Sequence, residues 1–440
     1  MKGGSDEGMK SIVFTPYPEL HPFEPFSFDP LPLKARAMDL PVLGYCTNVH
    51  AGASLQQTRD NLQRHAVQVK RLFSPDQPMG IGLWLSAASA RELVQARQVE
   101  AFAGWLKEQG LLPYTFNGFP YGDFHQQVVK HRVYEPTWWE PARLEYTLQL
   151  VDILDALLPA GEEGSISTLP IAWSQPCPDR EQNEQAALQL RQLAQSLHAL
   201  EERTGRLIYL CIEPEPGCVF SLADDAIHFF EWQLFRGEDA EVVRRHIRLC
   251  HDVCHAAVMF EDQADVLKRY HDAGILVGKV QVSAALRMNL DLLERPSAQT
   301  IHEHLMQVSS FNEPRYLHQT SVRRPDAEGY VEEIFYEDLH LALAAERELI
   351  ATNLAAGRGA GEWRVHFHVP IYQQELGLLS STQEQIAQCL AAARKYSDCR
   401  HYEVETYAWT VLPAELRPTE LATGIAEELR WFKQLWKEQE

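Results

Sequence analysis

The sequence lacks any run of about 18 uninterrupted apolar residues, which a membrane-spanning helix would need. Its first residues, MKGGSDEGMK, contain no hydrophobic segment of the signal-peptide type. Eight cysteines among 440 residues are too dilute for a disulfide scaffold, and none forms a CxxC pair with a matching partner elsewhere. We therefore expect reduced thiols, a cytoplasmic location and no direct insertion into a membrane.

Positive charge is also scarce. The 40 Lys and Arg residues are outnumbered by 61 Asp and Glu residues, which gives a formal net charge of −21, and no concentrated basic surface is visible in the sequence. Proteins that bind a phosphate backbone usually present such a surface, so we expect no nucleic-acid partner. The acidic balance does not exclude a local cationic pocket for a small molecule.

The composition, with 45% hydrophobic and 23% charged residues, is typical of a globular protein with a packed core. Short apolar segments alternate with longer amphipathic ones, a pattern that predicts parallel βα units. Amphipathic stretches such as NEQAALQLRQLAQSLHALEERTG end in glycine, as helices often do. The strands are predicted at residues 42–50, 79–86, 112–122, 165–173, 207–217, 249–258, 276–284, 364–372 and 402–409.

Nine strands are one too many for an eight-stranded barrel. We assign the segment at about 309–372 to an insertion before the last strand, in which VHFHVPIY is an extra extended segment. An early strand outside the barrel, or the His366 segment as the closing strand, are the alternatives. No Gly-, Ser- or Pro-rich linker divides the chain, so we predict a single TIM (β/α)8-type barrel over 41–440, with an N-terminal extension over 1–40 and a C-terminal helix.

Polar residues cluster where the predicted strands end, which is the active-site face of a parallel barrel. Any one of them has a structural explanation; Glu215, for example, can cap the following helix. Their convergence is more telling, because buried carboxylates and imidazoles are costly unless they are paired or bound to a metal. These residues are Asn48, His50, Asn117, Glu213, Glu215, Asp252, His255, Gln281, Arg287, His366, His368 and Glu405.

Carboxylate oxygens together with imidazole nitrogens suit a catalytic divalent ion such as Zn, Mn, Mg or Co. Such an ion polarises a carbonyl or hydroxyl group, and a carboxylate beside it can move a proton. This combination is typical of isomerase or epimerase chemistry.

Several of these positions resemble the xylose-isomerase-like barrels. In that superfamily a Glu ends the fifth strand, a D-x-x-H pair marks the sixth, a His ends the seventh and a Glu ends the eighth. The sequence has Glu213 in CIEPEPG, Asp252 and His255 in DVCH, and Glu405 in VETYAW, in the same order. The resemblance implies that these residues lie at a metal site.

Over nearly its full length the chain looks closer to one branch of that superfamily, the EboE-type metabolite traffic proteins. The stretches that carry this resemblance are LGYCTNVHAG, YTFNGFPYGDFHQQVVKHRVYEPTW, CIEPEPGC, VGKVQVSAALR, YLHQTSV, HFHVPIY and VETYAW. The resemblance implies a small polyhydroxylated, sugar- or cyclitol-like metabolite as substrate, and contact with other proteins of the ebo cluster as a further expectation. The resemblance does not indicate which reaction the protein would catalyse.

One position departs from the sugar epimerases: Gln281 in KVQVS stands where they have a metal-binding histidine. A glutamine oxygen can bind a hard ion but is a poorer ligand for zinc. Three outcomes are open. The metal is Mn or Mg; or His318, His366 or His368 from the insertion completes the site; or the metal has been lost.

Two functions compete. In the first, a metal-dependent isomerase or epimerase acts on a polyol-like metabolite, with Glu213 or Glu405 as the base. In the second, a non-enzymatic protein binds or hands on the metabolite, and ligand hydroxyl groups satisfy the buried polar residues. For the first, the metal residues are Glu213, Asp252, His368 and Glu405 with His255 and Gln281 nearby, and the predicted substrate residues are Asn48, His50, Asn117, Arg287, His318 and His366.

Overall fold

The computed structural model describes residues 42–293 and 296–439. Eight parallel strands pair in the order β1-β14-β7-β6-β5-β4-β3-β2, and a parallel bridge between Cys46 and Gly82 connects β1 with β2. The sheet is therefore a barrel, as predicted. Its strands are β1 (Val42–Tyr45), β2 (Met79–Leu83), β3 (Leu111–Asn117), β4 (Gly164–Thr168), β5 (Ile208–Ile212), β6 (Ile247–Asp252), β7 (Val277–Val282) and β14 (His401–Val404).

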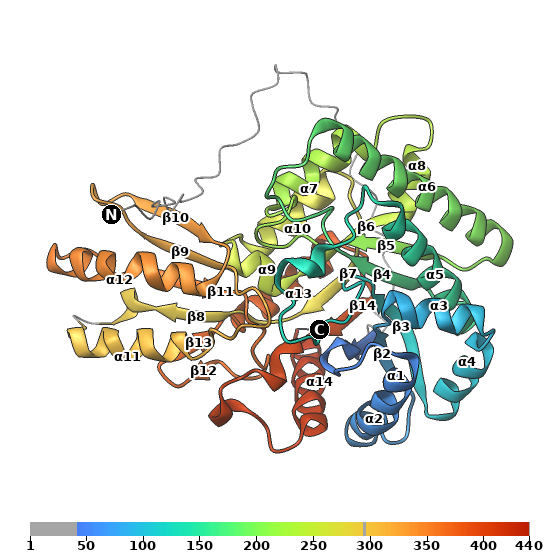
Figure 1. Ribbon diagram of the computed structural model, residues 1–440, viewed down its shortest axis with the longest axis horizontal. Helices are drawn as coiled ribbons and strands as arrows, with labels where there is room; N and C mark the ends of the chain where they lie inside the picture. The colour runs from blue at the N-terminus through green and yellow to red at the C-terminus, as the bar shows by residue number, and fades with distance from the viewer. Residues whose placement is uncertain (1–41, 294–295, 440) are drawn as a thin grey trace, which may run out of the picture.

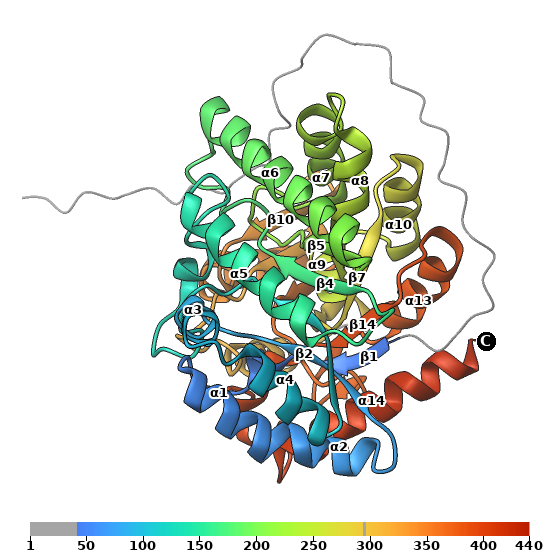
Figure 2. The same ribbon diagram turned by 90° about the vertical axis from the view of Figure 1, so that its right-hand side faces the viewer.

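Helices cover the outside of the barrel, where Figure 2 shows α5 and α6 side by side. The longest, α6, begins with a capping box formed by Asp179 and Gln182 and ends at Gly205, whose φ of 72° is left-handed. The helices that follow the barrel strands are α1 (Leu55–Asn61), α2 (Val67–Phe73), α3 (Ala87–Gln95), α4 (Val99–Glu108), α5 (Pro141–Leu157), α6 (Arg180–Thr204), α7 (Ala223–Phe229), α8 (Ala240–His246), α9 (Val253–Val258), α10 (Gln263–Asp272) and α13 (Glu384–Tyr396).

A second, antiparallel sheet lies beside the barrel between β7 and β14 in the chain (Figure 1). Its strands pair in the order β10-β9-β11-β8-β13-β12, and helices α11 (Ala298–Ser309) and α12 (Leu339–Ala355) pack on it. The predicted insertion at 309–372 falls within this segment, which starts earlier and ends later. The strands are β8 (Leu286–Asn289), β9 (Thr320–Pro325), β10 (Val331–Tyr336), β11 (Glu362–Val365), β12 (Glu375–Leu376) and β13 (Leu379–Ser381).

The extra predicted strand, at 364–372, overlaps β11 of the second sheet and takes no place in the barrel. The placement of this segment in the insertion is thus correct, and neither alternative holds. Because β11 ends at Val365, His366 and His368 follow it directly into the space above the barrel.

One predicted strand is wrong over its second half. The segment 249–258 is strand only as far as Asp252, and Val253–Val258 forms α9. The side chain of Asp252 accepts a hydrogen bond from the backbone N–H of His255, which makes Asp252 the N-cap of that helix. The alternation of a strand therefore ends at Asp252, and the capping preference of Asp252 was the missed signal.

The predicted C-terminal helix is α14 (Leu421–Glu438), which packs against α2 and β1. Its buried Glu428 accepts hydrogen bonds from the Thr406 hydroxyl at 2.6 Å and from the Ile371 N–H at 3.2 Å. The helix thus holds the two segments that follow His368 and Glu405. The predicted extension at 1–40 lies outside the described residues, and no helix among those described is long and apolar enough to cross a membrane.

We expect Glu428→Ala to lower the free energy of unfolding by about 1–3 kcal/mol, because buried donors would lose their acceptor. Denaturant unfolding followed by circular dichroism measures the change. Glu438→Ala in the same helix is the control, since Glu438 is exposed and its change should stay within about 0.5 kcal/mol of wild type. Equal stabilities of the two variants would contradict the role given to Glu428.

Candidate metal centre at the barrel mouth

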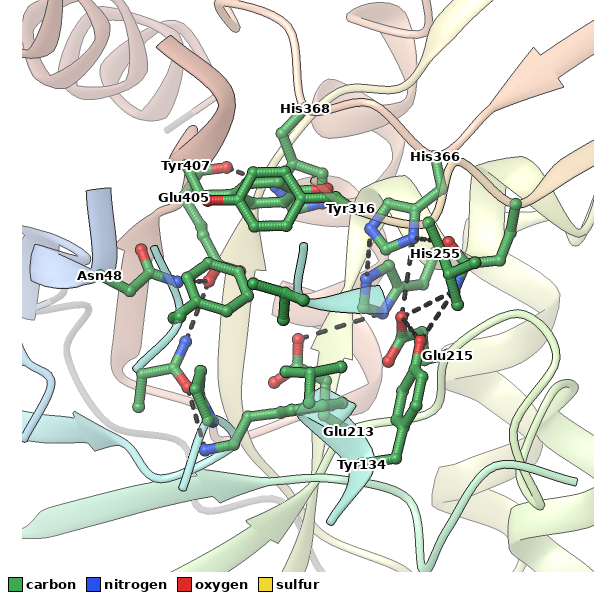
Figure 3. A pocket seen from close by; sticks show the side chains of 18 of the residues that line it. Asn48, Tyr134, Glu213, Glu215, His255, Tyr316, His366, His368, Glu405 and Tyr407 are labelled. Atoms are coloured by element: carbon green, nitrogen blue, oxygen red, sulfur yellow. Dashed lines mark hydrogen bonds and ion pairs between the residues drawn. The ribbon is translucent and has the colours of Figure 1, made fainter. Parts of the chain in front are cut away.

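Polar residues lie at the carboxyl ends of five barrel strands, and Figure 3 shows Asn48, Glu213 and Glu405 at the cavity there. Asn117 and Asp252 are the last residues of β3 and β6, while Glu213 and Glu405 follow β5 and β14 directly. Gln281 lies near the end of β7. Asn117, Glu213 and Glu405 border a cavity of about 70 Å³. Its lining residues are Asn48, Asn117, Phe119, Pro120, Phe124, Val129, Lys130, Val133, Tyr134, Glu213, Glu215, His255, Tyr316, Leu317, Gln319, His366, His368, Glu405 and Tyr407.

Three buried carboxylates form the centre of this site. Glu213, Asp252 and Glu405 each place a carboxylate oxygen within 4.8 Å of the others, and none of the three residues is more than 5% exposed. Asn48 and Asn117 donate hydrogen bonds to Glu405 Oε1 at 2.7 and 2.9 Å. These amides fix the orientation of the Glu405 carboxylate.

Several buried polar atoms at the centre have no hydrogen-bond partner in the described part of the chain. They are Glu213 Oε2, Asp252 Oδ2, His368 Nε2 and both side-chain polar atoms of Gln281. Unsatisfied buried polar atoms are rare and costly in folded proteins. Their grouping at one place fits a bound cation better than a packed core.

His368 is oriented for this role. Its Nδ1 lies 2.7 Å from the backbone oxygen of Glu405, and its Nε2 lies 3.9 Å from Asp252 Oδ2. Since a carbonyl oxygen only accepts hydrogen bonds, Nδ1 carries the proton and Nε2 presents its lone pair. Metal-binding histidines are commonly held in this way.

Burial and mutual repulsion alter the acidity of the carboxylates. Burial raises the pKa of Glu405 to about 8, and the negative charges of Asp252 and Glu403 add to the rise. The pKa of Glu213 is raised well above its usual value, mainly by burial and further by the negative charges of Glu405 and Asp252. Burial alone would raise the pKa of Asp252, but His255 and His368 outweigh it and lower that pKa. The site therefore holds both protonated and ionised carboxyl groups near neutral pH.

A buried ion pair lies in the barrel interior next to this centre. Lys279 Nζ is 2.6 Å from Glu403 Oε2, and both side chains are completely buried. Glycine at position 82 leaves the room for it, because a Cβ there would lie 1.2 Å from Glu403 Oε1. Lys279 partly offsets the repulsion by lowering the pKa of Glu213 and Glu405.

The structure brings most of the predicted residues together. Asn48, Asn117 and His366 line the cavity with Glu213, His255, His368 and Glu405. Asp252 and Gln281 are buried and do not line it, although Asp252 lies with Glu213 and Glu405 in the carboxylate group. Three predicted substrate residues are placed elsewhere. His50 bonds to the Tyr45 hydroxyl, Arg287 pairs with Glu384, and His318 bonds to Glu313 and to the His366 backbone.

Other residues of the site were missed by the sequence reasoning. Glu215 was placed on the active-site face but given no metal or substrate role; it is a cavity residue whose Oε1 accepts hydrogen bonds from Tyr134 and Gln319, rather than a helix cap. The aromatic wall of Tyr316 and Tyr407 carried no sequence signal, since aromatic residues of the core look the same. Lys279 did carry a sequence signal, because strand alternation places it on the same face of β7 as Gln281.

Comparisons with known proteins give only distant similarities. No protein-family model matches the sequence, and no curated protein matches it. Among solved structures, the IOLI protein with a bound zinc atom is 10% identical and has a TM-score of 0.44, covering 90% of this chain and 99% of its own. A xylose isomerase-like TIM barrel protein from Mycobacterium smegmatis, in complex with magnesium, is 12% identical with a TM-score of 0.43, covering 91% and 97%. A xylose isomerase domain protein from Alicyclobacillus acidocaldarius is 10% identical with a TM-score of 0.40, covering 90% and 99%. The barrel is established by its own strand pairing.

We expect the metal-free protein to lose stability as the pH rises from about 5 to 8. Glu405 holds its proton up to about pH 8 in the folded state, whereas in the unfolded chain it ionises near its ordinary value of 4.5. Between these values the folded state binds more protons, so the free energy of unfolding falls by up to roughly 1.4 kcal/mol per pH unit.

Thermal melting of chelator-treated protein across this pH range measures the effect. Glu405→Gln should weaken the dependence, leaving the part that the raised pKa of Glu213 contributes, while the exposed-site control Glu438→Gln should retain it in full. A melting temperature that rises from pH 5 to 8 in the metal-free wild type would show that the assigned direction is wrong.

Proposed function

We propose that the protein is a metal-dependent isomerase or epimerase that acts on a small polyhydroxylated metabolite. The observation that supports this is the convergence of Glu213, Asp252 and Glu405 from three strands, with free oxygen atoms beside the lone pair of His368. Oxygen-rich sites of this kind suit Mg or Mn, and a nitrogen ligand extends the choice to Zn or Co. Gln281 would add an amide oxygen in place of the histidine that sugar epimerases have.

The ion, when bound, would polarise a substrate carbonyl or hydroxyl oxygen and stabilise negative charge on it. The protein's own residues handle the proton. A carboxylate of the Glu213 and Glu405 pair takes the proton from the carbon beside the carbonyl, and its raised pKa suits proton transfer near neutral pH. In isomerisation the proton returns to the former carbonyl carbon, while the hydroxyl proton of the first carbon passes to the former carbonyl oxygen. In epimerisation a proton returns to the first carbon on its opposite face. Neither reaction needs an oxidant or a reductant.

The walls of the cavity complete the proposed roles. Asn48 and Asn117 hold the Glu405 carboxylate in place through their amide groups. Phe124, Tyr316 and Tyr407 pack on one another, with ring centroids 4.9 to 5.8 Å apart, and Tyr407 lies against His368. These rings offer an apolar surface for the carbon face of a sugar-like ring and help to exclude water.

The test combines metal content with proton exchange. Elemental analysis of the purified protein should show near-stoichiometric divalent metal, and Glu405→Gln should lower it. Incubation with panels of aldoses, ketoses and inositols in D2O should place deuterium on a substrate carbon, as seen by NMR. We expect Glu213→Gln and Glu405→Gln to reduce this exchange at least 100-fold, in line with loss of a general base, while the exposed Glu415→Gln has no effect.

The proposal would be contradicted if the wild-type protein contained no metal and if Glu405→Gln left the deuterium exchange unchanged.

A second candidate is a non-enzymatic protein that binds or hands on the metabolite. It is favoured by the two amides on Glu405, which already supply hydrogen bonds to that carboxylate without an ion, and by Gln281, a weak metal ligand. Native mass spectrometry of the purified protein distinguishes the two functions. A retained metabolite that stays chemically unchanged in the absence of metal supports the binding function, whereas its conversion supports the enzyme.

The pathway is a further part of the proposal. The resemblance of stretches such as CIEPEPGC and HFHVPIY to EboE-type proteins supports a place in an ebo-type metabolite pathway. We propose that any contact with other proteins of that cluster serves transfer of the metabolite to or from the cavity.

A further inference from the structure

A group of side chains able to bind a metal lies between α6 and α8, away from the cavity. His198 and Glu201 are three residues apart in α6, and His246 is the last residue of α8. The two helices pack against each other, and Figure 2 shows both on the outside of the barrel. One ligand atom from each of the three residues lies within 4.8 Å of the other two. We call these three residues the α6–α8 cluster.

The α6–α8 cluster is separate from the carboxylate centre. His246 directly precedes β6, whereas Asp252 is the last residue of that strand. A strand rises about 3.3 Å per residue, so the six residues from one to the other span roughly 20 Å. The cluster therefore lies at the opposite end of β6 from the carboxylates, and none of its residues lines the cavity.

The proton of His246 can be placed from one of its ring nitrogens. Nδ1 of His246 lies 3.0 Å from the backbone oxygen of Ile208. A carbonyl oxygen can only accept a hydrogen bond, so Nδ1 must carry a hydrogen. In a neutral imidazole the other nitrogen, Nε2, then presents a lone pair. This atom has no hydrogen-bond partner in the described part of the chain, and the side chain is 0% exposed, so bulk water does not reach it.

The lone pair of His246 faces a carboxylate. Glu201 Oε2 lies 3.4 Å from His246 Nε2. Arg245 donates to both oxygens of Glu201, with its Nε 2.7 Å from Oε2, so the orientation of that carboxylate is fixed. A lone pair beside an anionic oxygen is unfavourable unless a proton or a metal ion lies between or beside the two atoms.

A second imidazole favours a metal ion over a proton. Nδ1 of His198 is also buried and has no hydrogen-bond partner among the residues that the structure describes. The ring centroids of His198 and His246 are 5.9 Å apart. A proton on Nε2 of His246 would satisfy that nitrogen and leave the one of His198 without a partner. One metal ion, by contrast, accepts a lone pair from each imidazole and an oxygen from Glu201.

We propose that the α6–α8 cluster binds one divalent ion of the Zn²⁺ class. Two imidazole nitrogens and one carboxylate oxygen suit Zn²⁺, whereas Mg²⁺ prefers oxygen ligands alone. Arg245 holds the Glu201 carboxylate from its other side, and ligating carboxylates are commonly hydrogen-bonded in this way. The His198 side chain is 37% exposed, so the ion can enter from solvent and a water molecule can complete four-fold coordination.

The role of this ion is structural. His198 and Glu201 lie in the last two turns of α6, and His246 joins α8 to β6, so the ion would hold α6 against the start of that strand. An ion that binds only the folded chain stabilises it by mass action. The site does not depend on the proposed function, because it shares no residue with the carboxylate centre.

The test is a Zn²⁺ titration of the full-length protein, followed by calorimetry after removal of metal by a chelator. Both wild type and Glu405→Gln serve as backgrounds, because the barrel mouth has metal-binding groups of its own. In each background His198→Ala should lower the bound Zn²⁺ by one ion per chain, or weaken one site at least about 10-fold, since a ligand is lost. Glu201→Gln should have the same effect.

The matched control is His302→Ala, which removes an exposed histidine of α11 and should leave the number of bound ions unchanged. Thermal melting reports whether each variant folds. Without metal, His198→Ala should melt at nearly the same temperature as wild type, because the side chain is partly exposed. Added Zn²⁺ should raise the melting temperature of wild type and of His302→Ala more than that of His198→Ala.

The results separate this site from the proposed function. Equal Zn²⁺ binding by His198→Ala and His302→Ala would overturn the site and leave the isomerase standing. NMR signals showing both ring nitrogens of His246 protonated in zinc-loaded protein would also overturn it, because a proton would then occupy the place of the ion. A Zn²⁺ ion that is lost in His198→Ala but retained in Glu405→Gln would support the site, whether or not the substrate panels show deuterium exchange.

Discussion

Buried negative charge is the constraint on which the rest of the structure depends. Glu213, Asp252 and Glu405 end three different strands and share one small space, with Glu403 just beneath. Such a group is stable only if protons, a lysine or metal ions compensate it. Burial, with the charges of Asp252 and Glu403, raises the pKa of Glu405, and the buried Lys279 pairs with Glu403.

The second sheet is best understood as the support for one wall of this site. Its strand β11 ends at Val365 and delivers His366 and His368 above the barrel, and Gln319 at the start of β9 fixes the orientation of His366. The rigidity of a sheet suits this task, because metal ligands must be held in place before an ion binds. The insertion thus brings to the barrel the imidazoles that β7 itself does not provide.

The C-terminal helix makes a second connection between distant parts of the chain. Glu428 of α14 bonds to Thr406 and to Ile371, the neighbours of Glu405 and His368. Trp409 donates to the same carboxylate at 3.3 Å. Two segments that carry cavity residues, one from the barrel and one from the insertion, are therefore held by one buried residue that does not line the cavity.

The sequence by itself determined the barrel and much of the centre. Alternation of apolar and amphipathic segments located all eight barrel strands, and strand ends in a parallel barrel must meet, so Glu213, Asp252 and Glu405 could be grouped in advance. Only the tertiary structure decided the rest. The helix after Asp252 depends on local capping that overrides strand propensity. The position of Arg287 beside Glu384 and the facing of His255 and His366 depend on contacts between residues 97 and 111 positions apart in the sequence. Such contacts leave no periodic pattern in a single sequence, because the hydrophobic periodicity of each segment is the same whether or not the contact forms.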